Sequence, residues 1–282
     1  MNKTLRLGYS PCPNDTYIFF ALANGRIDTA PYQLEVSLAD VELLNQQARQ
    51  HLLDITKVSI SAVLHLLDDY WLLRSGGAIG RGCGPLVVAR RNLTLEDLKG
   101  KAIAVPGTLT TAHLLLQLTG AHQGDCVPMA FDRIMQAVSD GNVDAGVIIH
   151  EGRFTYHEWG LTRVLDLGAW WEEAAGLPLP LGGILIKRDL GAQTARFVDE
   201  KIRESLLYAN SHPHEAWPYI KSHAQEMADE VIRQHIETFV NEFSLDPGKE
   251  GERAIRFLLE AAAKQQRLAL PQKPVFWDEQ SE

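Results

Sequence analysis

The repeated alternation of short apolar runs with helical patterns over residues 5–67 constrains the fold most strongly. The runs LRLGY (5–9), YQLEVSL (32–38) and LDITKVS (53–59) are typical of strands, and a stretch with helical spacing of apolar residues follows each one. Strand–helix–strand order requires crossover connections, which are nearly always right-handed and join parallel strands. We therefore expect a largely parallel α/β sheet.

A second unit of the same kind follows a glycine-rich bend at residues 80–91. Residues 93–118 predict a short helix, a strand, a Pro-Gly-Thr turn and another helix, and residues 134–150 predict a helix and a buried strand that ends in a histidine. The apolar strand predicted over 176–189 can return the chain to the first unit. From about residue 194 onwards the pattern is helical, and we expect these helices to serve packing alone.

This order predicts two α/β lobes, of which the second is inserted in the first. Residues 1–88 and 186–282 are expected to form the first lobe with its C-terminal helices, and residues 89–185 the second lobe. Extended crossovers are expected near 84–90 and 182–187. A small ligand is expected in a cleft between the lobes, because ligands bind at domain interfaces and beyond the carboxyl ends of parallel strands.

The net charge indicates which classes of binding partner to expect. Lysine and arginine number 27 and the acidic residues 36, a net charge of −9 that argues against nucleic acid or an anionic membrane as the main partner. A small anionic ligand stays possible, because local cations and helix N-termini override the global sign. The composition does not indicate an oligomeric state.

Cysteine usage and hydropathy predict the compartment. The sparse, odd set Cys12, Cys83 and Cys126 is typical of reduced thiols. The first residues contain no apolar run of about 7–15 residues like that of a secretory signal, and no stretch approaches the roughly 18 apolar residues of a membrane span. We expect a cytoplasmic protein.

The segment SPCPNDT follows the first predicted strand, where the binding crevice is expected. Its two prolines restrict the backbone, and Asn14, Asp15 or Thr16 is expected to cap the next helix. Ser10, Asn14 and Thr16 are candidates for the cleft wall, and an ordinary strand-to-helix turn is an equally good interpretation. A redox or metal role for Cys12 is disfavoured, since no thiol or histidine is nearby in the sequence.

Two further strand-to-helix junctions carry polar residues. Lys57 and Ser59 lie where the strand within LDITKVS gives way to a helix, and a cation with exposed N–H groups at such a point can bind a carboxylate. In PGTLTTAHLLL, Thr110 and Thr111 offer hydroxyls at a helix start, without the Gly-Lys-Ser/Thr ending of a phosphate-binding loop. The alternatives are a solvated lysine and plain helix capping.

His150 follows the apolar run AGVII and is predicted at the mouth of a buried strand that faces the cleft. A histidine next to a carboxylate, here Glu151, can act as a general base near neutral pH, and Arg153 is a further candidate for the wall. A structural histidine is the more common alternative. HEGRFTYH lacks the spacing of a zinc motif, so no metal is predicted. Trp170 and Trp171 could stack on a flat ligand or pack between the lobes.

Taken together, SPCPNDTYIFFAL, DITKVS, SGGAIGRGCGPLVV, PGTLTTAHLLL, DAGVIIHEGRFTY and DLGAWWEEAAGLPLPLGGI resemble the 1,4-dihydroxy-6-naphthoate synthase family of the futalosine route to menaquinone. The resemblance spans most of residues 5–186. It implies a two-lobed fold like that of the type II periplasmic binding proteins, and a cytoplasmic carbon–carbon lyase without a cofactor. The implied reaction converts cyclic dehypoxanthinyl futalosine to 1,4-dihydroxy-6-naphthoate and a sugar-derived fragment.

The same resemblance implies roles for single residues. The proton-accepting histidine of the family falls on His150. The contacts with the small carboxylate substrate fall on Lys57, Val58, Ser59, Thr110 and Thr111. Two other functions stay open: a solute-binding protein of the same fold that only captures its ligand, and the sister enzyme that dehydrates chorismate. SPCPNDT and HEGRFTY favour the naphthoate synthase over the dehydratase.

Overall fold

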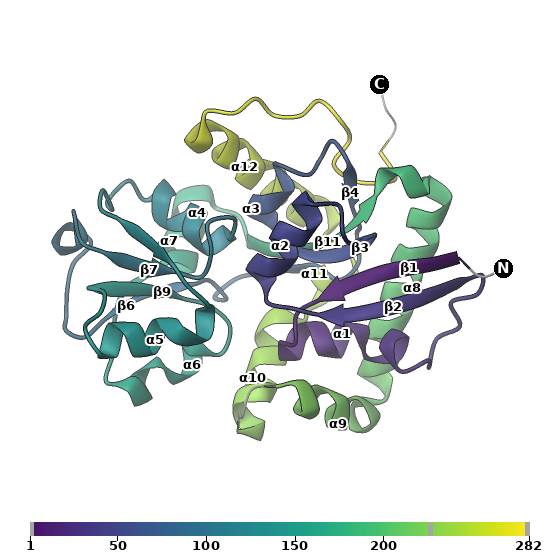
Figure 1. Cartoon of the computed structure of the whole chain (residues 1–282), viewed down its shortest axis with the longest axis horizontal. Coiled ribbons are helices and arrows are strands. Elements are labelled where there is room, and N and C mark those ends of the chain that lie inside the picture. The colour runs from purple at the N-terminus through teal and green to yellow at the C-terminus, as the bar shows by residue number, and fades with distance from the viewer. Residues whose placement is uncertain (1–2, 225–227, 280–282) are drawn as a thin grey trace.

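The computed structural model describes residues 3–224 and 228–279. Residues 225–227 of the predicted helical tail, and the ends of the predicted first lobe at 1–2 and 280–282, lie outside the described residues. Two β-sheets, each with helices packed against it, form the molecule (Figure 1). We call the elements around the sheet that contains the N-terminal strand the first lobe, and those around the other sheet the second lobe.

The first sheet has the strand order β2-β1-β3-β11-β4, with β5 also paired to β11. Both neighbours of β1 run parallel to it, as the predicted crossovers require. The expectation of a largely parallel sheet is wrong for β11, which pairs antiparallel with β3, β4 and β5 because it returns from the second lobe without a crossover helix. The strands are β1 (Lys3–Tyr9), β2 (Tyr32–Leu38), β3 (Ile55–Ser59), β4 (Tyr70–Leu72), β5 (Ala78–Gly80) and β11 (Leu179–Lys187).

The second sheet has the order β10-β6-β9-β7-β8. β7 is parallel to β8 and β9, whereas β6 is antiparallel to β9 and β10. β6 and β11 are the strands on which the chain passes between the sheets, and the lobe boundaries at 88/89 and 185/186 stay predictions. The strands are β6 (Leu86–Ala89), β7 (Ile103–Val105), β8 (Cys126–Pro128), β9 (Ala145–Ile148) and β10 (Thr162–Asp166).

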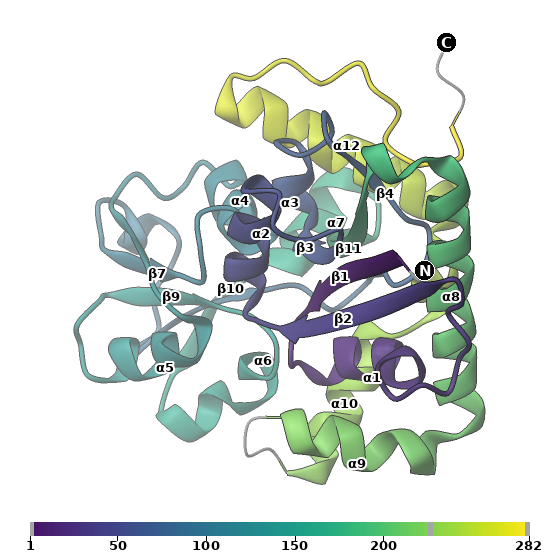
Figure 2. The same ribbon diagram turned by 45° about the vertical axis from the view of Figure 1, so that its right-hand side comes forward.

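Helices cover both faces of the first sheet (Figure 2). One apolar cluster joins α1 and α8 to inward residues such as Leu7 and Ile184, and α9 and α10 pack against α1 beneath. The opposite face is covered by α2, α3 and α12. The helices of this lobe are α1 (Pro13–Ala23), α2 (Val41–Arg49), α3 (Ile60–Val63), α8 (Ala192–Ser211), α9 (Pro213–His223), α10 (Asp229–Phe239), α11 (Glu242–Leu245) and α12 (Gly248–Gln266).

One continuous apolar cluster joins the two lobes. It contains Leu185 of β11 and Leu258 of α12 in the first lobe, and Val105 and Val147 of the second sheet. The lobes are therefore held together by shared packing as well as by the crossing strands. The helices of the second lobe are α4 (Thr111–Leu118), α5 (Phe131–Ser139), α6 (Gly152–Thr155) and α7 (Leu167–Ala175).

The predicted helical tail is interrupted between α10 and α11. α10 ends at Phe239, and the Asn241 side chain accepts a hydrogen bond from the Phe243 amide while the Ser244 hydroxyl accepts one from the Asn241 amide. This capping box starts α11 and so interrupts the apolar pattern. Within the two described ranges, no helix is both long and apolar enough to cross a bilayer.

Candidate active site

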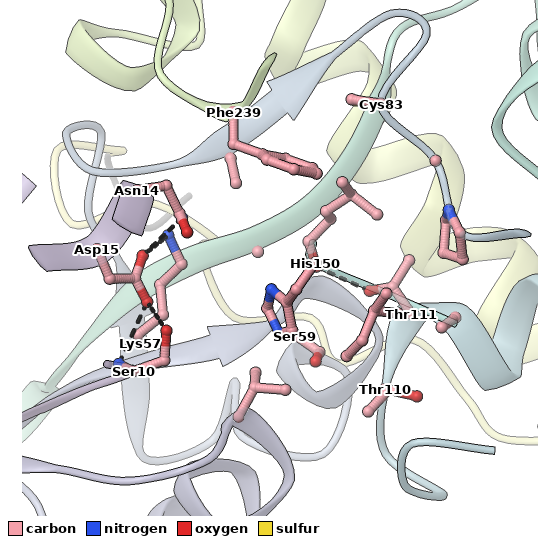
Figure 3. Close-up of a pocket in the computed structure, with 18 of the residues that line it drawn as sticks. Ser10, Asn14, Asp15, Lys57, Ser59, Cys83, Thr110, Thr111, His150 and Phe239 are labelled. Atoms are coloured by element: carbon pink, nitrogen blue, oxygen red, sulfur yellow. Dashed lines mark hydrogen bonds and ion pairs between the residues drawn. The ribbon is translucent and has the colours of Figure 1, made fainter. Parts of the chain in front are cut away.

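A pocket lies between the lobes (Figure 3). Residues from both lobes line it, and they include nine of the ten residues that the sequence nominated: Ser10, Asn14, Lys57, Val58, Ser59, Thr110, Thr111, His150 and Arg153. The tenth, Thr16, is fully buried, and its hydroxyl donates instead to the carbonyls of Cys12 and Pro13.

A buried ion pair forms the centre of the first-lobe wall. Lys57 lies in the middle of β3 rather than at the expected end of the strand. Its Nζ lies 3.0 Å from Asp15 Oδ1 in α1 and donates a 2.9 Å hydrogen bond to the Gly76 carbonyl. Both charged side chains are buried. An unpaired buried charge is far more costly than a paired one, so the pairing offsets part of the cost of burying both side chains.

Asp15 also binds the neighbouring loop. Its Oδ2 accepts hydrogen bonds from the Ser10 hydroxyl at 2.7 Å and the Ser10 amide at 3.2 Å, and its Oδ1 accepts one from Asn14 Nδ2 at 2.9 Å (Figure 3). The prediction that Asn14, Asp15 or Thr16 caps this helix is wrong. α1 begins earlier, with Pro13 at its first position, because proline has no N–H to satisfy there and its φ already suits a helix.

Ser59 is held by a residue that the sequence did not nominate. The Ser59 amide donates to Asn45 Oδ1 at 2.9 Å, and its hydroxyl accepts from Asn45 Nδ2 at 3.2 Å. Asn45 is a fully buried residue on α2, whose N-terminus is capped by the Asp40 side chain. A polar residue on the inner face of an amphipathic helix was the signal available for it. The reciprocal bonds fix the Ser59 hydroxyl at the pocket.

The two threonines of the second lobe have different roles. Thr110 caps α4, because its Oγ1 accepts from the His113 amide at 3.2 Å and donates to the Gly107 carbonyl at 2.8 Å. Thr111 bridges the lobes, since its Oγ1 donates to the Leu181 carbonyl at 2.9 Å and accepts from the Ser61 amide at 3.2 Å. Both lie at the first turn of α4, where helix N–H groups lack partners within the helix.

His150 follows β9 and lines the pocket, as predicted. Its backbone has φ 54°, the left-handed region that non-glycine residues rarely adopt. In the part of the chain that the structure describes, its Nε2 is buried without a hydrogen-bond partner. The ring meets Phe131 of α5 edge to face, with centroids 5.0 Å apart. Backbone strain of this kind costs about 1–3 kcal/mol and concentrates at functional sites.

The remaining polar groups of the pocket are paired or neutral. Arg153 forms an ion pair with Asp166 at 2.9 Å and donates to the Gly84 carbonyl, so its charge is compensated. Burial raises the pKa of the Cys83 thiol to about 12, which keeps it protonated at neutral pH. Among residues 3–224 and 228–279, no group of three or more histidine, cysteine or acidic side chains has an arrangement that could hold a metal ion.

The aromatic residue that lines the pocket is not one of the two tryptophans considered in the sequence. Trp171 is buried, its Nε1 donates to the Pro178 carbonyl at 3.1 Å, and its ring packs on Phe257 of α12 with centroids 5.6 Å apart. This is the packing alternative stated for the two tryptophans. Phe239, at the end of α10, lines the pocket instead. Sequence reasoning missed it because it lies on the apolar face of a helix to which only packing was assigned.

Known proteins resemble this chain in sequence and in fold. A family profile described as menaquinone biosynthesis matches residues 5–264. A 1,4-dihydroxy-6-naphthoate synthase of Thermus thermophilus is 54% identical over 276 residues, which are 97% of this chain and 99% of that protein. A crystal structure of a protein from Archaeoglobus fulgidus has a TM-score of 0.88 at 37% identity, and the match covers 94% of this chain and 98% of that one.

A more distant likeness identifies the architecture. The periplasmic aliphatic sulphonate binding protein of Escherichia coli has a TM-score of 0.65 at 14% identity, and the match covers 95% of this chain and 89% of that one. At this identity the likeness shows the fold alone. The two-lobed α/β architecture is that of the periplasmic binding proteins, as expected.

Proposed function

This chain belongs to the menaquinone-biosynthesis family and is an enzyme of the 1,4-dihydroxy-6-naphthoate synthase type, and we propose that it cleaves cyclic dehypoxanthinyl futalosine with His150 as general base. The product is 1,4-dihydroxy-6-naphthoate, released together with a sugar-derived fragment. The observation that carries the choice of base is the position of His150, which combines an unusual backbone conformation with a ring nitrogen that is buried and unpartnered within the described chain.

The chemistry needs one positioned base. Forming the aromatic ring of the product requires cleavage of a carbon–carbon bond and removal of a proton. An imidazole is suited to this step because its ordinary pKa of about 6.5 leaves it mostly neutral at pH 7. Lys57 is paired with Asp15, Arg153 is paired with Asp166, and burial keeps the Cys83 thiol protonated. His150 is therefore left as the group that can accept the proton.

We assign the substrate carboxylate and hydroxyls to two segments that line the pocket, one in β3 and one at the start of α4. On one side lie Lys57, Val58 and Ser59, and on the other Thr110 and Thr111. A lysine ammonium has three donors, of which two are directed at Asp15 and Gly76, so one stays available for the substrate. Closure of the lobes, divided at 88/89 and 185/186, would exclude water from the reaction.

We place the enzyme in the cytoplasm, with a small carboxylate as its partner and neither nucleic acid nor a membrane as a main partner. Two properties support this assignment. The net charge of −9 opposes binding to nucleic acid and to anionic lipid. The three cysteines are free thiols, as is usual in a reducing compartment.

Incubation with the substrate tests the function directly. We expect the purified protein to convert cyclic dehypoxanthinyl futalosine to the naphthoate, detected by mass spectrometry, and the His150→Ala variant to lose most of this turnover while still binding. Tight binding without turnover by the wild-type protein would instead support the solute-binding alternative. Dehydration of chorismate would support the sister enzyme.

A further inference from the structure

A second histidine lies behind the proposed base. His235, on α10 of the first lobe, is fully buried, and its ring stacks near that of His150 with centroids 6.0 Å apart and an interplanar angle of 15°. His150 itself belongs to the second lobe and has Phe131 of that lobe on another side. The ring of His150 is therefore enclosed by one aromatic side chain from each lobe.

Hydrogen bonds determine which nitrogen of His235 carries its proton. Asn14 Nδ2 donates to Asp15, so Asn14 Oδ1 is left as the acceptor, and it lies 3.0 Å from His235 Nε2. An amide oxygen cannot donate, so Nε2 must carry the hydrogen. The Nδ1 atom of His235 is then a bare acceptor, buried and without a partner among the residues described.

His235 is held by a chain of buried contacts rather than by one bond. The chain runs from the Gly76 carbonyl through Lys57, Asp15 and Asn14 to the His235 ring. Burial, together with the neighbouring His150, lowers the pKa of His235 well below its usual value, so the ring is neutral. Two adjacent imidazoles thus each have one buried nitrogen without a hydrogen-bond partner in residues 3–224 and 228–279. Buried polar atoms are nearly always hydrogen-bonded, so both nitrogens require an explanation.

We propose that His235 is the positioning residue of the catalytic base: it holds the His150 ring across the lobe interface and supplies the Nδ1 lone pair toward which the imidazolium turns once His150 has taken a proton. The proposal rests on the assignment of His150 as base. It gives the C-terminal helical tail a part in catalysis, and it explains why the pair Lys57–Asp15 and the amide of Asn14 are buried in the pocket wall next to His235.

The other groups near the two rings do not compete for this role. Lys57 and Asp15 are paired at 3.0 Å, and Arg153 is paired with Asp166. Burial raises the pKa of the Cys12 and Cys83 thiols, so both stay protonated at neutral pH. Glu151, next to His150 in the chain, is the remaining acid, and the substitutions described below leave it in place.

Two conservative variants separate positioning from packing. His235→Gln keeps a donor for Asn14 but loses the acceptor at the δ position, whereas His235→Asn keeps an acceptor at that position and loses the bond to Asn14. We expect His235→Gln to lower kcat by about 10- to 100-fold, a fraction of the roughly 10²- to 10⁴-fold that a general base contributes, with KM little changed.

The pH profile gives the direction of the effect. Without the acceptor the His150 imidazolium is less stable, so the acid limb of kcat/KM in His235→Gln should move to lower pH. His235→Asn should restore both the rate and the limb in part. Phe131→Leu is the matched control, because it changes the other ring that contacts His150 and should leave the acid limb in place.

A third measurement needs no variant. Nitrogen NMR of the wild-type protein labelled at histidine should show His235 as the Nε2–H tautomer, neutral from pH 6 to 8. An Nδ1–H tautomer, titration of His235 in that range, or an unmoved acid limb in folded His235→Gln would each overturn the proposal. His150→Ala is assayed alongside: if it is inactive while His235→Gln is unaffected, only the role of His235 falls. An active His150→Ala would remove the base itself, and this proposal with it.

Discussion

The two walls of the pocket use buried polar groups in opposite ways. On the first-lobe wall, Asp15 accepts hydrogen bonds from Ser10 and Asn14 and pairs with Lys57, so that its carboxylate is fully occupied (Figure 3). On the second-lobe wall, His150 keeps a buried nitrogen that nothing in the described chain satisfies, on a backbone with φ 54°. Satisfied polar groups rigidify a structure, and unsatisfied ones are retained where chemistry needs them. The comparison predicts that substitutions in the first-lobe wall mainly lower stability, whereas substitution of His150 in the second-lobe wall mainly lowers the rate.

The largest effect is expected from His150→Asn. Asparagine is among the residues that best tolerate the left-handed conformation, so the backbone can stay as it is. The loss of the base should lower kcat by about 10²- to 10⁴-fold, while the free energy of unfolding in urea stays within about 1 kcal/mol of wild type.

A parallel substitution at His51, which also has a positive φ of 55° but lies away from the pocket on an exposed turn, is the control for the backbone effect. His51→Asn should change neither rate nor stability noticeably. A His150→Asn protein that unfolds readily, or that turns over near the wild-type rate, would contradict the division of roles between the walls.

Lys57→Met, in the first-lobe wall, should lower stability first, and activity as a consequence. Methionine fills similar space but leaves the Asp15 carboxylate buried without its cation, and removal of one partner from a buried pair costs about 3–5 kcal/mol. Denaturant unfolding should show this loss even without substrate. Activity is expected to fall as well, because Asp15 positions the loop that forms the wall.

The double variant Asp15→Leu, Lys57→Met tests the electrostatic cause. Replacing both charges by apolar side chains leaves no uncompensated charge, so the double variant should be more stable than Lys57→Met alone. If the double variant loses as much free energy of unfolding as Asp15→Leu and Lys57→Met lose in total, the two charges are not coupled and the account of this wall is wrong.

The sequence predicted the positions of the site better than the bonds within it. Strand ends and helix starts indicated Lys57, Ser59, Thr110 and His150, because the connection between a strand and a helix is a local property of the chain. The partner of each depended on tertiary packing. Asp15 was interpreted as a helix cap, although it pairs with Lys57, a residue far along the chain and on a different element.

In the helical tail too, the local sequence predicted the elements but not the tertiary contacts of single side chains. Its apolar spacing correctly predicted packing helices, yet Phe239 lines the pocket and His235 contacts His150. Nothing in the local pattern distinguishes a histidine that faces the base from one that faces a core. The antiparallel pairing of β11 was missed for a related reason, since strand direction follows from where the chain re-enters the first sheet.

Two glycines, Gly84 before β6 and Gly168 in α7, permit a close approach of the backbone at one edge of the pocket. A Cβ on Gly84, beside β6, would lie 2.2 Å from the Cα of Gly168, and backbone there cannot move aside as a side chain could. Gly84→Ala should therefore destabilise the protein by about 1–3 kcal/mol and raise KM, because the Gly84 carbonyl is bound by Arg153 of the pocket.

Gly77→Ala is the matched control for that substitution, since its added Cβ would meet its nearest neighbour at 3.7 Å, an ordinary contact. We expect thermal unfolding and KM close to wild type for Gly77→Ala. Equal effects of the two substitutions would show that the loss comes from backbone stiffness alone and not from the close approach of Gly84 and Gly168.

The smallest effect concerns a polar contact between the walls themselves. Glu42 of α2, in the first lobe, accepts a 3.2 Å hydrogen bond from the Leu109 amide of the second lobe, and burial raises the pKa of its carboxyl above the usual 4.5. The folded protein therefore keeps this proton at pH values where the unfolded chain has already lost it. The free energy of unfolding contributed by Glu42 is largest at acid pH and falls as pH rises through the raised pKa.

Glu42→Gln removes that dependence and keeps an oxygen for the Leu109 amide. The free energy of unfolding of the variant, relative to that of the wild type, should rise from pH 4 to pH 7. At pH 7 the two proteins should differ by no more than about 0.5 kcal/mol. Urea unfolding of both proteins at the two pH values measures it. A difference that is the same at pH 4 and pH 7 would mean that Glu42 ionises as freely in the folded protein as in the unfolded chain, and that this junction between the walls is open to water rather than sealed.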